Sequence, residues 1–178
     1  MYISHGSWIP CSSWWKLGRC GLLQLPQKLK QFCWCLLKLY LPTRFNLHCR
    51  GVSCPTICVL CDDAVEDDMH LFFGCAHFRD CWVATNLWSK IEQKLLSFHV
   101  LPELFFSIFA GIWNKKKSRF VPLLWSIWHA RNEVLREHKT LNVSATCRAA
   151  TDAVQHSSRS YIYTTTLSIF GETCSKLD

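Results

Sequence analysis

The feature that most constrains the fold is a compact set of soft metal ligands near the middle of the chain. The segment CVLCDDAVEDDMHLFFGC places Cys58, Cys61, His70 and Cys75 at the spacing C-x2-C-x8-H-x4-C. The first pair can bend around one ion, and the second can close a tetrahedron from a following helix or turn. Three thiolates and one imidazole suit Zn²⁺, and four protein ligands leave no position for a reactive water. The spacing therefore predicts one structural zinc ion in a closed site.

Two neighbouring side chains are alternative ligands. Cys54 precedes Pro55 and would form a less usual C-x3-C pair, whereas ligation by His77 would leave His70 without a role. Other cysteines fall on expected helical faces and are predicted to be small core residues. They are Cys33, Cys35, Cys49 and Cys81.

Apolar residues upstream of the cysteines recur with helical spacing. After Pro26 they are predicted to form one face of a helix that stops at Pro42: Leu29, Phe32, Cys33, Leu36, Leu37 and Tyr40. Thr43 is expected to cap a second, short helix through about Cys49, and Gly51 to close it in a left-handed conformation.

Helical patterns return after the ligands. They are expected over residues 76–96, from Pro102 to about residue 113, over 121–138 and, more weakly, over 143–158, with Lys115–Lys117 as a solvated break. Arg131 projects from the apolar face of the helix over 121–138, so we expect it to pair with a backbone carbonyl or a carboxylate.

The predicted fold class is mainly α, a small helical domain with an inserted Cys-Cys-His-Cys zinc knuckle. The predicted parts are a poorly defined N-terminal segment (1–25), a zinc-binding module (26–96), a helical C-terminal region (97–160) and a tail (161–178).

The net charge of +7 is unevenly spread along the chain. Residues 1–61 hold seven Lys or Arg and no Asp or Glu, whereas residues 62–68 hold five acids. Four of these acids are expected to be solvated loop residues: Asp62, Asp63, Asp67 and Asp68. A basic half favours contact with a polyanion such as RNA or DNA, although an ordinary solubilising surface is the alternative. The candidate nucleic-acid contacts are Lys28, Lys30, Lys38, Arg44 and Arg50.

No segment has the pattern of a membrane span or of a secretory signal. We therefore expect an intracellular protein, in the nucleus or the cytoplasm. In that setting its twelve cysteines are expected to be thiols or metal ligands rather than disulfides.

The stretch from Lys28 to Trp82 contains several short motifs in a fixed order. They are KLKQFCW at 28–34, LPTRFNL at 41–47, the four ligands, Glu66, HLFFGC at 70–75 and CW at 81–82. In this order and spacing the stretch resembles the reverse transcriptase zinc-binding domain of plant non-LTR retrotransposons. WSIWHARNEV at 125–134 resembles a segment that often follows this module, ahead of a ribonuclease H domain. The resemblance implies a zinc-binding module whose partners are the reverse transcriptase or ribonuclease H domains of a parent element.

Catalytic residues of those enzymes are not recognisable in this sequence. The polymerase needs an aspartate pair, usually in a Tyr-x-Asp-Asp turn, to hold two metal ions, and ribonuclease H needs several converging carboxylates. After residue 138 the only acids are Asp152, Glu172 and Asp178. We therefore expect a nucleic-acid-binding accessory module that is not an enzyme. The alternative is a protein-interaction module or structural remnant of a degraded reverse transcriptase that binds no nucleic acid.

Overall fold

A computed structural model describes residues 25–112, 114–137, 142 and 144–149. This part of the chain is mainly helical, as predicted, and its one piece of β-type pairing is an isolated antiparallel bridge between Ile57 and Val65. The predictions for residues 1–24 and for the tail lie outside the described residues.

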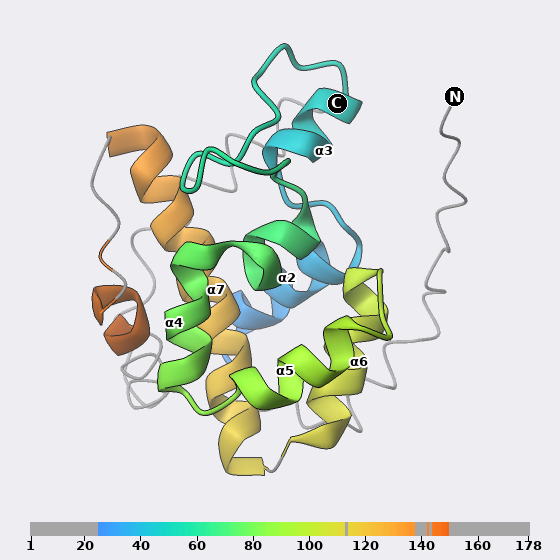
Figure 1. Ribbon diagram of the computed structural model, residues 1–178, viewed down its shortest axis with the longest axis vertical. Coiled ribbons are helices and arrows are strands. Elements are labelled where there is room, and N and C mark those ends of the chain that lie inside the picture. Colours follow the sequence, from blue (N-terminus) through green and yellow to red (C-terminus); the bar gives the residue numbers. More distant parts are fainter. Residues whose placement is uncertain (1–24, 113, 138–141, 143, 150–178) are drawn as a thin grey trace.

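The helices follow one another with short connections. They are α2 (Gln27–Leu37), α3 (Arg44–Cys49), the π-helical turn η3 (His70–Gly74), α4 (Ala76–Ala84), α5 (Trp88–Leu95), α6 (Leu101–Gly111) and α7 (Asn114–Glu137). Residues 144–149 are also helical. Figure 1 shows α3 and the following loop at one end of the molecule, with the long α7 running beside α4. Within the described part, no helix is long and apolar enough to cross a membrane.

Helix α2 buries the predicted apolar face except at its last position. Leu29, Phe32 and Leu36 lie in the core, but Tyr40 is 50 % exposed, so its assignment to the buried face is wrong. The helix ends at Leu37, and Leu39 adopts a left-handed conformation with φ +57°. This reversal turns Tyr40 outward.

Helix α3 begins and ends where the sequence predicts. The Thr43 hydroxyl accepts a hydrogen bond from the Asn46 amide at 3.3 Å, which satisfies one free donor of the first turn. Gly51 has φ +82°, a conformation in which glycine avoids the clash of a Cβ. None of the helix residues is buried, so the prediction that Cys49 is a core residue is wrong. Cys33, Cys35 and Cys81 are buried as predicted.

The later helices differ from the prediction at their boundaries. Residues 76–96 form two helices, since Asn86 has φ +56° and separates α4 from α5. Helix α6 ends at Gly111 as expected, but the lysine run is not a break, because α7 already begins at Asn114. Lysine is a good helix former. The interruption lies instead at Ile112, whose backbone is extended.

The apolar core gathers around Trp82, a residue of α4 with no exposed surface. Its ring stacks on Phe73 at 5.5 Å between centroids and contacts Phe120 of α7 at 5.6 Å. The indole N–H donates to the carbonyl of Phe72 at 2.7 Å. One core therefore packs directly beneath η3 and joins it to α7.

Candidate metal centre

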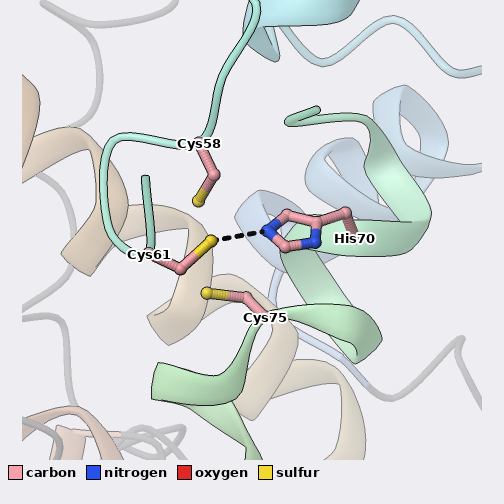
Figure 2. Close-up of side chains that lie close together, drawn as sticks. All are labelled: Cys58, Cys61, His70 and Cys75. Atoms are coloured by element: carbon pink, nitrogen blue, oxygen red, sulfur yellow. Dashed lines mark hydrogen bonds between the residues drawn. The ribbon is translucent and has the colours of Figure 1, made fainter. Parts of the chain in front are cut away.

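The four predicted ligands converge on one point. Their ligand atoms all lie within 4.8 Å of one another, and among the described residues they are the one group of three or more side chains that could hold a metal ion. Figure 2 shows the three sulfur atoms and the imidazole of His70 directed at a common centre. Cys58 and Cys75 are buried, while Cys61 and His70 are partly exposed. The alternatives lie elsewhere, since Cys54 donates to the Arg44 carbonyl and His77 is exposed.

The loop that carries the first cysteine pair is closed by backbone hydrogen bonds. The Cys58 amide donates to the Ala64 carbonyl at 2.8 Å, and the Asp62 amide donates to the Cys58 carbonyl at 3.0 Å. Asp62 has φ +53°, a conformation that Asp tolerates better than most residues. This tight turn brings the Cys58 and Cys61 side chains to the same side of the loop.

The second pair is brought together by a π-helical turn. In an α-helix with 3.6 residues per turn, side chains five positions apart point about 140° away from each other. In η3 the Cys75 amide instead donates to the His70 carbonyl at 2.6 Å. This i→i+5 hydrogen bond widens the turn, so side chains five positions apart point closer together than in an α-helix. Asp67 fixes the start of this turn, because its carboxylate accepts a hydrogen bond from the His70 amide. The spacing H-x4-C is therefore compatible with one ion.

Hydrogen bonds within the cluster favour a thiolate at Cys58. The hydrogen bond with the Cys75 thiol, assisted by the backbone amides of Cys61 and Leu60, lowers the pKa of Cys58 to about 4. The same hydrogen bond and burial raise the pKa of Cys75 above its ordinary value. A thiolate at Cys58 gives the site a negative charge that favours binding of a cation.

The separations suit a tetrahedral Zn²⁺ ion. Zinc–sulfur bonds of about 2.3 Å and zinc–nitrogen bonds of about 2.0–2.1 Å place S and N ligands about 3.6 Å apart around a tetrahedron. The Cys61 sulfur and the His70 Nε2 are 3.4 Å apart, which is close to that value. A set of three thiols and one imidazole matches the ligand preference of zinc and not of hard cations such as Mg²⁺.

A buried ion pair ties the ligand loop to α7. Glu66 stands between the two ligand pairs and is fully buried, and Arg131 is 3 % exposed. The Arg131 guanidinium donates to both carboxylate oxygens, through Nε at 3.2 Å and through Nη2. The Arg44 amide adds a third hydrogen bond at 3.0 Å. This confirms the prediction that Arg131 pairs with a backbone carbonyl or a carboxylate, although sequence patterns alone did not identify Glu66 as its partner.

The four aspartates of residues 62–68 do not all behave as solvated loop residues. Asp62 and Asp63 are exposed, but Asp68 is buried, so the prediction is wrong for Asp68; Glu66 is buried as well. Asp68 accepts a hydrogen bond from Asn46 at 2.8 Å, and burial raises its pKa to about 6. The surface beside the cluster is therefore less acidic than the sequence indicates.

The five basic candidates do not converge on one point. Lys28 lies over the ring of Trp125 in α7 at 5.6 Å, whereas the Arg44 guanidinium donates to the Ile57 carbonyl at 2.6 Å. Arg50 is exposed, with a long 3.5 Å contact to the Leu39 carbonyl. Lys30 and Lys38, on and just after α2, are partly exposed.

A helical body with a Cys₃His cluster on an inserted loop and a π turn has the form of a small module that could hold a metal ion. Residues 10–82 match the family model described as zinc-binding in reverse transcriptase. The match contains all four clustered side chains and ends at Trp82, the centre of the core. No curated protein and no solved structure matches the chain.

Proposed function

We propose that this chain is an accessory module of a reverse transcriptase, held together by one structural zinc ion, that binds nucleic acid without catalysis of its own. The observation that carries the zinc assignment is the convergence of three thiols and one imidazole within 4.8 Å. Four protein ligands close the site, so zinc would supply folding energy and not a reactive water. The absence of recognisable polymerase and ribonuclease H carboxylates in the sequence supports a non-catalytic role.

Metal content tests the zinc assignment directly. We expect the purified full chain to contain one Zn²⁺ per molecule by elemental analysis, and His70→Ala with Cys75→Ala to abolish it. Cys54→Ala is the matched control, because Cys54 is a neighbouring cysteine that hydrogen bonds outside the cluster. A wild-type chain that folds with no zinc would contradict the assignment.

The region around α3 supports nucleic-acid binding. Phe45 on α3 is 42 % exposed and Tyr40 is 50 % exposed, and the Tyr40 and Trp34 rings pack in a T shape at 5.4 Å between centroids. The Asn46 amide group donates to the Leu39 and Leu41 carbonyls, so the Tyr40 segment lies against α3.

Basic side chains accompany these aromatic rings. Arg50 is exposed just after α3, and Lys38 is partly exposed just after α2. Exposed aromatic rings beside cations are the combination with which proteins bind single-stranded nucleic acid, by stacking on the bases and neutralising phosphates. The partner that we propose is therefore single-stranded RNA or DNA.

Binding of single strands at several salt concentrations tests this part of the proposal. Stacking on an aromatic residue is worth about 1–3 kcal/mol per base, so Tyr40→Ala should weaken binding by about 5- to 150-fold. Arg50→Ala should reduce the salt dependence by about 0.7 in the slope of log K against log salt. Lys90→Ala is the control, an exposed cation on α5. Absence of binding, or binding whose affinity does not change with salt concentration, would refute the proposal that the chain binds single-stranded nucleic acid.

A second candidate function is docking to a polymerase or ribonuclease H domain of the parent element. It is favoured by further exposed apolar residues in the segments before and after α3: Leu39, Val52, Ile57 and Val65. If the chain binds no nucleic acid but is captured by the separately expressed polymerase domain, and Ile57→Ser weakens that capture, this candidate replaces the first.

A further inference from the structure

Two cysteines outside the candidate metal centre lie in contact. Cys81, in α4, is fully buried, and Cys147 lies partly exposed in the helical residues 144–149. Their thiols hydrogen bond with each other. Figure 1 shows this C-terminal helical segment beside α4. The contact joins two elements that are far apart in the sequence.

The position of Cys147 is fixed by a local cap and by packing. The side-chain oxygen of Asn142 accepts a hydrogen bond from the Ala145 amide at 2.9 Å. The backbone carbonyl of Asn142 accepts a hydrogen bond from the Thr146 amide at 3.0 Å. These bonds start the helical turn that carries Cys147. Thr146 is buried, and Cys147 packs against the apolar core. The cap and the packing against the core therefore hold the Cys147 thiol next to Cys81.

We propose that Cys81 and Cys147 are a redox-active pair that forms a disulfide when the protein meets a peroxide. A metal ion is a poorer explanation of the pair, because no third metal-binding side chain joins it among the described residues. Disulfide formation needs only two sulfurs in contact with a compatible backbone. In a reducing compartment the pair rests as two thiols.

The reaction proceeds in two balanced steps. Cys147 is partly exposed, so its sulfur attacks hydrogen peroxide, and the O–O bond breaks to give a sulfenic acid and one water. The Cys81 sulfur then attacks the Cys147 sulfur, and the hydroxyl leaves with the Cys81 proton as a second water. The two thiols lose two electrons in total, and the peroxide is reduced to two waters.

The disulfide would join the C-terminal helical segment covalently to α4. Helix α4 follows Cys75 directly, so the bond would attach residues 144–149 to the helix that follows the metal centre. Under reducing conditions the same segment is held by packing and hydrogen bonds alone. The pair therefore offers redox control over how residues 144–149 are attached to α4.

Peptide mapping of the full chain, loaded with Zn²⁺ and treated with hydrogen peroxide, tests the proposal. Trypsin releases Cys81 in peptide 80–90 and Cys147 in peptide 140–148, each with a single cysteine. We expect these two peptides to be linked, and the link to disappear on reduction. Cys147→Ser should abolish the linked species, whereas Cys49→Ser should leave it unchanged.

The exposed Cys49 also reports the oxidant dose in the wild-type chain. If Cys49 becomes oxidised while peptide 80–90 keeps a free thiol, the pair is not redox-active and the proposal is wrong. Linkage of Cys81 or Cys147 mainly to other cysteines would also overturn it. Because the decisive measurement uses the wild-type chain, it does not depend on how well any variant folds.

Discussion

The ion pair between Glu66 and Arg131 offers the sharpest test of how the ligand loop is attached to the helical body. Removing one partner of a buried ion pair leaves the other charge without compensation and costs about 3–5 kcal/mol. Arg131→Met removes the guanidinium but keeps much of its apolar volume over Trp128, whose ring lies 5.2 Å away. The Glu66 carboxylate then keeps only the Arg44 amide as a donor.

We expect Arg131→Met to lower the free energy of unfolding by about 3–5 kcal/mol, a large part of the 5–15 kcal/mol typical of a domain. Urea unfolding of the zinc-loaded chain, followed by tryptophan fluorescence, measures this change as a lower midpoint at constant slope. Adding Glu66→Gln should recover at least about 1 kcal/mol, because the double variant no longer buries an unpaired charge.

Arg136→Met is the matched control. Arg136 lies near the end of the same helix and is exposed, so its loss should change stability by no more than about 0.5 kcal/mol. The reasoning fails if Arg131→Met costs less than about 1 kcal/mol. It also fails if the double variant is no more stable than Arg131→Met, because the orphaned carboxylate would then not be the cause.

Three further predictions concern the metal, a turn and the core. A strong chelator should remove the zinc and lower the melting temperature of the full chain, as followed by circular dichroism. Readdition of Zn²⁺ should restore the metal content and the melting temperature. An unchanged melting temperature would contradict a structural role of the zinc. Gly51→Ala should cost about 1 kcal/mol in urea unfolding, because alanine is strained at φ +82°, and an unchanged midpoint would show that the turn relaxes. Trp82→Ala should cost about 3–5 kcal/mol, whereas Trp88→Ala, at a partly exposed position, should cost clearly less in the same assay.

Local signals predicted the features that depend on neighbouring residues alone. The cap at Thr43, the left-handed Gly51 and the buried face of α2 follow from side-chain chemistry and helical spacing, and the structure has all three. The grouping of the four ligands also follows from short spacings. Whether they bind zinc is a prediction that metal analysis must decide.

Features set by tertiary contacts were predicted poorly. Asp68 and Cys49 were misassigned because burial depends on which elements cover a segment. The side chain of Asp68 is enclosed beside Asn46, whereas the whole of α3 has no buried residue. Tyr40 continues the helical spacing of α2, yet the left-handed Leu39 ends that register one residue earlier. A periodicity cannot reveal where the backbone leaves the helix when no glycine or proline marks the place.

The spacing between His70 and Cys75 shows how a ligand pattern and a helical pattern can conflict. The run HLFFGC must bury Leu71, Phe72 and Phe73 and also turn both ligands toward one ion. A regular α-helix could not direct side chains five positions apart to the same point, whereas the wider turn of η3 does so without losing the helical hydrogen bonds. Deleting Gly74 would convert the turn to i→i+4 spacing without changing any ligand. We therefore expect this deletion to keep the helical content and to weaken Zn²⁺ binding. The Cys75 thiol would then point at a different angle from the His70 side chain, and the buried residues would shift by one position along the helix.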